Sequence, residues 1–194
     1  MNDLVHRHFK IHKPFGYLSQ FVTNDIKGQR KKLLTELYTF PDGIMAIGRL
    51  DEKSEGLLLL TTDGKLSDHI NSSKIEKEYY AQIDGIITNE AIDKLQNGVE
   101  IGFNGQKYFT KPCKVARIEP PNVMERPKKI RDARHGPTSW ISICLSEGKF
   151  RQVRKMTAAT GYPTLRLIRI RIGTIFLKEM RAGDVKEISK IHIQ

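Results

Sequence analysis

The stretch GRLDEKSEGLLLLT, residues 48–61, joins a polar turn to an apolar strand and gives the clearest guide to the fold. Its second half, residues 57–61, is a short apolar run followed by Thr62-Asp63-Gly64, so we expect a buried strand that a turn closes. Three carboxylates lie in the first half, at positions 51, 52 and 55. Polar side chains between two apolar strands often line a cleft, but an exposed turn explains each carboxylate more simply when it is taken alone.

Strand patterns recur along the chain and outnumber the helical ones. Alternating or apolar runs predict strands at residues 9–13, 44–47, 57–61, 78–83, 114–118, 140–145, 165–172 and 175–177. Helices are expected from the N-cap Thr88 to Asn97-Gly98, and over residues 150–160 before Gly161. We therefore predict an α+β fold with a mixed, largely antiparallel sheet flanked by helices and loops. Residues 1–194 are expected to form one domain, either undivided or as two subdomains that share the sheet.

The composition indicates a soluble protein with a polyanionic partner. There are 33 Lys and Arg residues against 22 Asp and Glu residues, which gives a net charge of +11. Such an excess favours nucleic acid first and a membrane surface second, and no basic amphipathic helix supports the second. No apolar run reaches the roughly 20 residues of a membrane helix, and the N-terminus has no signal-peptide core. We expect a cytoplasmic protein with no membrane partner.

The cysteines and histidines do not suggest a metal site. Cys113 and Cys144 lie in alternating apolar runs without metal-ligand spacing, so we expect two buried free thiols. His6, His8 and His12 could line one face of a strand and hold a metal ion. A half-exposed strand start is the simpler interpretation of these three histidines.

Residues 119–138 form a long stretch without periodicity that carries four prolines and a run of basic side chains. Loops of this length are uncommon in compact domains unless they function or are disordered. Two interpretations stay open, a solvated charged loop and an arm that contacts RNA. In the second, Lys128, Lys129 and Arg131 would neutralise phosphates.

Two further segments carry side chains suited to binding. In EGKFRQVRKM, residues 147–156, a helix N-terminus rich in Arg and Gln suits a phosphate or carboxylate, and a plain solvated basic face is the alternative. In KEYYAQ, residues 77–82, Tyr79 and Tyr80 must point to opposite faces of a strand. One ring can then belong to the core while the other faces a cleft and stacks on a base.

Together these segments resemble the pseudouridine synthases of the RsuA type. The resemblance rests on the opening Lys-Pro-x-Gly signature, the catalytic motif, the Lys-x-Tyr motif, the third motif and the closing strand of that family. These five motifs occur in the family's order, at residues 13–20, 48–61, 77–79, 147–156 and 165–173. Five ordered motifs that span nearly the whole chain are far more specific than the four letters GRLD alone.

The resemblance implies an activity and a set of site residues. Members of the family convert a uridine in RNA to pseudouridine, and the motifs then imply that Asp51 is the catalytic carboxylate, Tyr79 the active-site tyrosine and Arg154 the partner of the aspartate. The isomerisation involves no redox change, so we expect no cofactor and no metal. Contacts with RNA are expected from a group of basic and polar side chains: Arg49, Lys77, Lys128, Lys129, Arg131, Arg151, Gln152 and Lys155.

Within the family, Pro120-Pro121 with the basic loop, residues 137–140 and residues 151–154 look most like the RluE branch, which modifies large-subunit ribosomal RNA. RsuA-type members commonly carry an N-terminal S4 RNA-binding module, which we do not expect because Lys-Pro-x-Gly begins at residue 13. The third motif usually has Arg-Asn where this chain has Lys149-Phe150, and Arg where it has Lys155. These differences affect contacts with RNA and not the reaction.

The resemblance therefore predicts a monomeric enzyme whose partner is the RNA of the large ribosomal subunit, 23S ribosomal RNA, or its precursor. One alternative is a ribosomal-RNA-binding protein that has lost catalysis. Another is a synthase of the same family that acts on 16S ribosomal RNA or transfer RNA. A map of pseudouridines in cells that lack the protein would separate the three.

Overall fold

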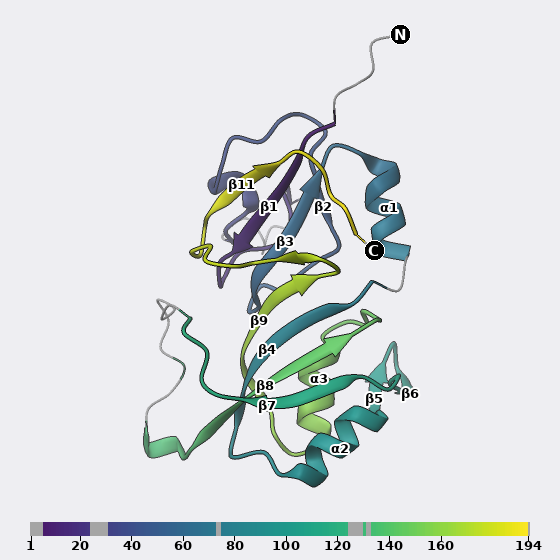
Figure 1. Ribbon diagram of the computed structural model, residues 1–194, viewed down its shortest axis with the longest axis vertical. Coiled ribbons are helices and arrows are strands. Elements are labelled where there is room, and N and C mark those ends of the chain that lie inside the picture. The colour runs from purple at the N-terminus through teal and green to yellow at the C-terminus, as the bar shows by residue number, and fades with distance from the viewer. Residues whose placement is uncertain (1–5, 24–30, 73–74, 124–129, 131–132, 194) are drawn as a thin grey trace. The chain divides into compact units, whose positions relative to one another are not determined.

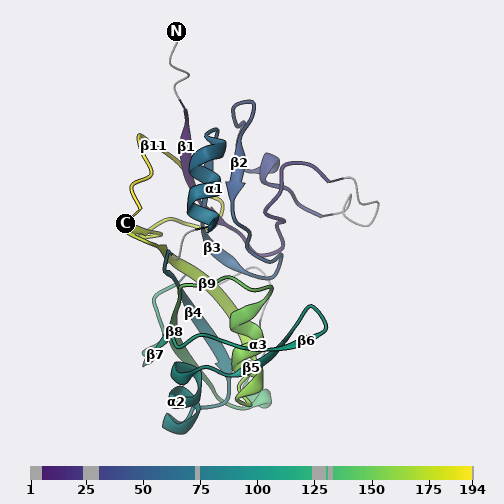
Figure 2. The ribbon, with the colours of Figure 1, turned by 90° about the vertical axis from the view of Figure 1, so that its right-hand side faces the viewer.

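The computed structural model describes residues 6–23, 31–72, 75–123, 130 and 133–193. The chain divides into two compact units, which are described separately. Unit 1 comprises Met1–Ile75 and Arg169–Gln194, and unit 2 comprises Glu76–Ile168. Strand β9 (Thr164–Ile172) belongs to both, because the boundary falls between its residues Ile168 and Arg169. Figures 1 and 2 show the course of the chain through both units.

Unit 1 contains the strand order β11-β1-β3-β9, with β2 paired to β3 and β10 paired to β9 (Figure 1). The pairings of β1 with β11, β1 with β3, β2 with β3 and β10 with β9 are all antiparallel. The elements are β1 (His8–Lys13), the 3-10 helix η2 (Leu34–Glu36), β2 (Met45–Ile47), β3 (Glu55–Thr61), α1 (Gly64–Ser72), β10 (Ile175–Phe176) and β11 (Val185–Ile188).

Strand β3 lies between β1 and β9 in unit 1, where the apolar run at residues 57–61 predicts a buried strand. Every residue from Glu55 to Thr61 is buried, which is typical of an apolar run covered on both faces. Leu58 and Leu60 pack with Phe9 and Ile11 of β1 in one core cluster. This packing holds β3 in place, and with it the start of the strand, where the link that carries Asp51 joins the sheet.

The segment after β3 corrects one expectation. Thr62-Asp63-Gly64 was expected to close β3 as a simple turn, but helix α1 begins at Gly64. The carboxylate of Asp63 accepts a hydrogen bond from the backbone N–H of Leu66 at 3.1 Å. Asp favours both turns and helix N-caps because its side chain can replace a backbone acceptor, and here it caps a helix.

Unit 2 contains the strand order β9-β4-β8-β7, and the β5–β6 hairpin forms a sheet of its own. The pairings of β4 with β8, β7 with β8 and β5 with β6 are antiparallel. The elements are β4 (Lys77–Asp84), α2 (Asn89–Asn97), β5 (Glu100–Phe103), β6 (Gln106–Phe109), β7 (Lys114–Ile118), the 3-10 helix η3 (Ala133–His135), β8 (Thr138–Leu145) and α3 (Gln152–Ala159).

Both helices of unit 2 contribute to one apolar core with the strands. Leu95 of α2 and Met156 of α3 are fully buried beside Ala81 of β4 and Ile143 of β8. Helix α2 has the predicted ends, since the Thr88 hydroxyl accepts from the Ala91 N–H and Gly98 follows its last turn with a φ of 100°. The core therefore holds α3, and with it the third motif, against the sheet of unit 2.

Two local features of unit 2 differ from the expectations. Helix α3 begins at Gln152 and not at residue 150, because Arg151 adopts a left-handed conformation with a φ of 53°. The β5–β6 hairpin was not expected, although its turn, Asn104-Gly105, has positive φ at both residues. Asn-Gly between two short alternating runs is a strong hairpin signal in a sequence.

Other expectations can be compared with the described residues. The α+β class and the largely antiparallel pairing are confirmed. Neither cysteine forms a disulfide; Cys144 is buried and Cys113 is only half-buried. Of the expected loop at 119–138, residues 133–135 form η3 and Thr138 begins β8, while Lys128, Lys129 and Arg131 lie outside the described residues. In the described part of the chain, no helix combines the length and the apolar character needed to cross a membrane.

Candidate active site

Asp51 lies in unit 1, in the short polar link between β2 and β3. Its side chain is half-buried, and its carbonyl oxygen accepts a hydrogen bond from the Ser54 N–H at 3.0 Å. Gly48 enters this link with a φ of +69°, a conformation that side chains other than glycine rarely adopt. Residues 51–54 of the link thus form a defined turn, and Asp51 is the first residue of that turn.

A second segment of unit 1 holds this turn in place. The hydroxyl of Ser19 donates to the Leu50 carbonyl at 2.9 Å and accepts from the Leu50 N–H at 3.0 Å. The Gly16 N–H donates to the Glu52 carbonyl at 2.8 Å. The residues on both sides of Asp51 are therefore bonded to the opening Lys-Pro-x-Gly segment, and because Ser19 is buried, water cannot readily replace it.

Lys13 is the most unusual residue of this region, because its side chain is fully buried. Its ammonium group donates to the carbonyls of Pro14 at 2.9 Å and Tyr17 at 2.7 Å. Burial lowers the pKa of Lys13 to about 7, although the negative charges of Glu55, Asp51 and Glu52 act in the opposite direction; Arg169 lowers it further. The Lys13 amine is thus enclosed beside the turn that carries Asp51, where burial favours its neutral form.

Arg169 and Gly56 bring β3 and β9 together in unit 1. The buried guanidinium of Arg169 donates through Nε to the Leu57 carbonyl at 2.7 Å. A Cβ on Gly56 would lie 2.3 Å from the Arg169 carbonyl oxygen, and Gly56 has a φ of +106°. Only glycine permits this close approach, so the residue after Glu55 is set by the backbone of β9.

Tyr79 lies in unit 2, on β4, where it is opposite Ile143 of β8. Its ring is half-buried and packs against the core of unit 2. Ala81, on the same face of β4, is fully buried in that core. Tyr80 is opposite Ser142 and also half-buried. Successive side chains on a strand point to opposite faces, so the two tyrosine rings separate as the sequence predicts.

Arg154 lies in the first turn of α3, also in unit 2. Its side chain is half-buried, and Nη1 donates to the Thr164 carbonyl at 3.2 Å. Thr164 begins β9, so this hydrogen bond joins the third motif to the closing strand. The contact limits the rotation of the guanidinium group.

Gln152 was expected to contact RNA, but the structure uses its amide inside the protein. The residue is buried, its Oε1 accepts from the Lys149 N–H at 2.9 Å, and its Nε2 donates to the Glu147 carboxylate. Glu147 also accepts from the Tyr108 hydroxyl and the Lys111 N–H. Burial acts against this carboxylate, but the three hydrogen bonds hold its pKa below the ordinary value. Gln152 therefore acts on the surface only through the segment that it fixes.

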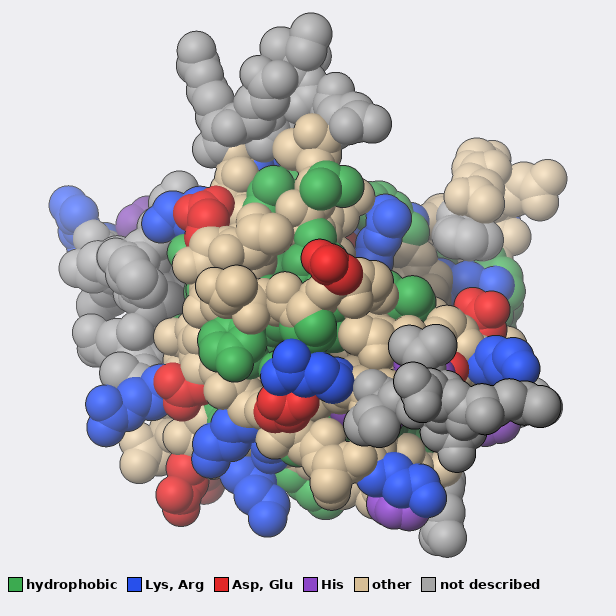
Figure 3. Space-filling view, turned by 90° about the horizontal axis from the view of Figure 1, so that it is seen from above, with side chains coloured by type: hydrophobic (Ala, Val, Ile, Leu, Met, Phe, Trp, Pro, Cys, Tyr) green, Lys and Arg blue, Asp and Glu red, His purple; other side chains and the backbone are tan. Residues whose placement is uncertain are grey.

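The other residues expected to contact RNA are distributed over both units. Arg49 is exposed in unit 1, next to the turn of Asp51. Lys77, Arg151 and Lys155 are half-buried in unit 2. On the face drawn in Figure 3, the Lys and Arg side chains of the described residues are interspersed with Asp and Glu, so no unbroken basic patch is visible there.

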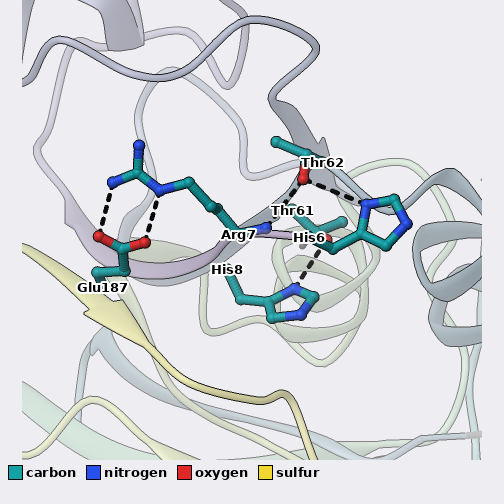
Figure 4. Close-up of polar contacts among 6 residues, drawn as sticks. All are labelled: His6, Arg7, His8, Thr61, Thr62 and Glu187. Carbon is teal, nitrogen blue, oxygen red and sulfur yellow. Dashed lines mark hydrogen bonds and ion pairs between the residues drawn. The ribbon is translucent and has the colours of Figure 1, made fainter. Parts of the chain in front are cut away.

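The N-terminal histidines form hydrogen bonds along β1 (Figure 4). His8 is buried with Nδ1 2.9 Å from the Thr61 hydroxyl, and His6 is exposed with Nδ1 3.4 Å from the Thr62 hydroxyl. Beside them Arg7 forms a bidentate ion pair with Glu187. Among the residues that the structure describes, no group of three or more His, Cys, Asp or Glu side chains is arranged to hold a metal ion.

Several residues around Asp51 received no role in the sequence analysis. They are Ser19, Glu55 and Arg169, together with Lys13, which was noted only as part of a motif. A signal for Lys13 was present, because it continues the alternation of Phe9 and Ile11 and so occupies a core position of β1. Ser19 carries no such signal, since its two hydrogen bonds join residues that lie far apart in the sequence.

Comparisons with known proteins agree with the motifs. The profile of the family described as RNA pseudouridylate synthase matches residues 7–159. The chain is similar to the ribosomal large subunit pseudouridine synthase E of Vibrio parahaemolyticus, with 40% identity over 96% of this chain and 76% of the relative. A relative of the same name from Xanthomonas campestris is 38% identical over 90% of this chain and 91% of its own length.

A solved structure gives the same result for the fold. A crystal structure of a pseudouridylate synthase, 26% identical in sequence, superimposes with a TM-score of 0.72 and covers 94% of this chain and 70% of that one. The predicted resemblance is thereby confirmed at the level of the family. The chain belongs to the RNA pseudouridylate synthase family and is an RNA pseudouridine synthase.

Proposed function

We propose that this enzyme converts a specific uridine of large-subunit ribosomal RNA, 23S RNA or its precursor, into pseudouridine, with Asp51 as the catalytic carboxylate. The observation that carries the choice of RNA is the similarity, over nearly the whole chain, to relatives named as large-subunit synthases E. For Asp51, the support is its position in the GRLD motif and the hydrogen bonds that fix its neighbour Leu50 to Ser19.

The reaction needs a group that can act at the sugar or base without redox chemistry. The N1–C1′ bond of uridine breaks, the uracil turns, and a C5–C1′ bond forms, after which the proton on C5 is lost. An ionised carboxylate can attack as a nucleophile, or remove a proton so that the base leaves through a glycal. Both routes require the Asp51 carboxylate to be charged and held at a fixed angle, and the rigid turn around it serves that requirement.

The remaining site residues have supporting roles in this proposal. Arg154 pairs with the Asp51 carboxylate in the complex with RNA, and Tyr79 stacks on the uracil once the target nucleotide has left its stack. Arg49, Lys77, Arg151 and Lys155, with Lys128, Lys129 and Arg131, hold RNA phosphates, and Gln152 supports them from below the surface. The enzyme acts as a monomer in the cytoplasm, with no membrane partner.

Removal of the Asp51 charge tests the chemistry directly. We expect Asp51→Asn to lower pseudouridine formation on 23S RNA by at least about 1,000-fold while RNA binding stays within about twofold, because a neutral amide is neither nucleophile nor base. The matched control is Glu52→Gln, since Glu52 follows Asp51 and its carboxylate forms a surface ion pair with Lys31 at 2.6 Å. Substantial activity in Asp51→Asn, or an equal loss in Glu52→Gln, would remove Asp51 from the role.

Arg154→Lys should also be severely impaired in pseudouridine formation, because an ammonium group cannot replace a bidentate guanidinium.

The target RNA is tested in cells that lack the protein. Pseudouridines are mapped in 23S, 16S and transfer RNA, and the map is repeated after the wild-type and Asp51→Asn genes are restored. One missing modification in 23S RNA that only the wild-type gene restores would support the proposal. A missing modification in 16S or transfer RNA would overturn the choice of target, and an unchanged map would favour a binding protein without catalysis.

A further inference from the structure

On unit 2, the residues that lead into α3 lie against the β5–β6 hairpin (Figure 2). Several contacts join the hairpin to these residues and to the first turn of α3. The Tyr108 hydroxyl donates to the Glu147 carboxylate at 2.5 Å, and the Lys149 ammonium lies 4.9 Å from the centroid of the Tyr108 ring. The Lys155 ammonium donates to the Gly102 carbonyl at 2.6 Å. The face of the hairpin that carries Tyr108 therefore forms one continuous surface with the third motif. This surface, termed here the hairpin surface, comprises Gly102, Tyr108, Lys111 and residues 147–155.

Phe150 is the most exposed apolar side chain of the third motif. It keeps 65% of its surface accessible even though the Lys155 ammonium lies over its ring, 5.4 Å from the centroid. The left-handed conformation of Arg151 makes α3 begin at Gln152, so Phe150 stands outside the helix and takes no part in its packing. Non-glycine residues in this conformation cost about 1 kcal/mol or more and often mark functional sites.

The charge around Phe150 is positive. Between residues 147 and 155 there are four basic side chains, Lys149, Arg151, Arg154 and Lys155, against the single carboxylate of Glu147. That carboxylate accepts three hydrogen bonds from within unit 2, from Tyr108, Lys111 and Gln152. An exposed aromatic ring by itself is ordinary. An exposed ring with one cation over it and further basic residues beside it in the chain is the combination that single-stranded nucleic acid requires, because bases stack on the ring while phosphates meet the charges.

We propose that the hairpin surface binds single-stranded RNA, with the Phe150 ring stacked on a base and with Lys149, Arg151 and Lys155 near the phosphates on either side. A paired base is stacked within its helix and cannot reach the ring, so the surface selects unpaired nucleotides. This inference rests on the proposed function only in that RNA is the substrate. It assigns to Phe150 and the hairpin a role that is separate from the chemistry of Asp51.

The test measures binding of a labelled single-stranded RNA of roughly a dozen nucleotides, within the range of common single-strand sites, by fluorescence anisotropy. We expect Phe150→Ala to weaken binding roughly 5- to 100-fold and to leave the salt dependence unchanged, because a stacking contact is lost without loss of charge. Phe150→Tyr should restore most of the affinity. Lys149→Ala should instead lower the slope of log affinity against log salt by about 0.7.

Phe109 provides the matched control. It is also 65% exposed, but it follows Tyr108 on β6 and therefore points to the opposite face of the hairpin, where its ring lies against Gly98. Phe109→Ala should bind within about twofold of wild type. Wild-type affinity in Phe150→Ala, or an equal loss in Phe109→Ala, would overturn the proposal. The Asp51→Asn enzyme, which should bind this RNA normally, separates a failure of the surface from a failure of the catalytic assignment.

Discussion

The segments around Asp51 and around Arg154 use polar groups in opposite ways. Beside Asp51, the charged side chains of Lys13, Glu55 and Arg169 are all buried. Beside Arg154, the third motif leaves Phe150 exposed and keeps Lys149 and Lys155 half-exposed. Burial of a charge is costly unless it is paired, so buried charges are found where geometry must be fixed, and exposed ones where a ligand can reach them.

The same contrast extends to the backbone. In unit 1, the backbones of β3 and β9 approach so closely that Gly56 has no room for a side chain, and Ser19 bonds both backbone groups of Leu50. In unit 2, the approach to α3 is held mainly through one carboxylate, that of Glu147. The first arrangement tolerates little change, while the second can vary at its surface without loss of the fold. The predictions below test that difference.

Gly56→Ala should give the largest effect on stability. A Cβ would lie 2.3 Å from the Arg169 carbonyl oxygen and 2.6 Å from its nitrogen, and the φ of +106° is itself unfavourable for alanine. We expect the free energy of unfolding to fall by more than about 3 kcal/mol, as measured by urea denaturation. Gly148→Ala, at a position with no atom within 4 Å and no positive φ, should change it by no more than about 0.5 kcal/mol. If the two variants lose similar amounts of unfolding free energy, the close approach of β3 and β9 at Gly56 is not the constraint that the comparison assumes.

Lys13→Met should reveal the cost of the buried cation through its pH dependence. The pKa of Lys13 is lowered to about 7 from 10.5, so between these values the folded protein binds fewer protons than the unfolded chain. Wild-type stability therefore rises with pH in this window, by up to about 1.4 kcal/mol per pH unit. Below pH 7 both states bind the proton, so the pH dependence disappears while the full cost of the buried charge remains. The unfolding free energy of wild type minus that of Lys13→Met should increase by about 2 kcal/mol from roughly pH 7.5 to 9, because only the wild-type value rises with pH.

The control for this experiment is Lys65→Met, which removes an exposed charge from the start of α1 in the same unit. An exposed ammonium group keeps its contact with water on folding, so this variant should follow wild type at every pH. If the difference in unfolding free energy between wild type and Lys13→Met is the same at every pH, Lys13 is not buried at a cost to its charged form.

Much of the fold can be predicted from the sequence wherever the signal acts between neighbouring residues. Helix α2 was predicted with both ends because Thr88 and Gly98 act on neighbouring residues, and β3 because its apolar run is continuous. Helix α1 was missed because Asp63 suits a turn as well as a cap, and only tertiary packing decides between them. The predicted start of α3 at residue 150 was wrong because Arg151 adopts a left-handed conformation, which no local sequence pattern indicates.

The candidate site divides in the same way. The motifs point to Asp51, Tyr79 and Arg154 because the resemblance is carried by short local stretches. Ser19 and Arg169 could not be predicted, since the contacts Ser19–Leu50 and Arg169–Leu57 depend on how distant strands and loops are brought together. Gln152 was expected at the RNA surface, but a polar residue at a helix start can equally bond to the segment before the helix, as its amide does here with Lys149 and Glu147.

Glu147→Gln should give a smaller, pH-dependent loss that sharpens the comparison from the side of unit 2. An amide offers one acceptor oxygen and no charge to the three donors that meet the carboxylate, so we expect a loss of about 1–2 kcal/mol near neutral pH. The hydrogen bonds hold the pKa of Glu147 below its ordinary value of 4.5, so this contribution is present above that value and is lost as the pH falls through the lowered pKa. Glu100→Gln removes an exposed ion pair with Lys107 on the same hairpin and should cost less than about 1 kcal/mol. If the two variants unfold alike at every pH, the hairpin is held by apolar packing and not by the Glu147 carboxylate. Charge would then matter in this part of unit 2 only for binding at the surface and not for the fold beneath it.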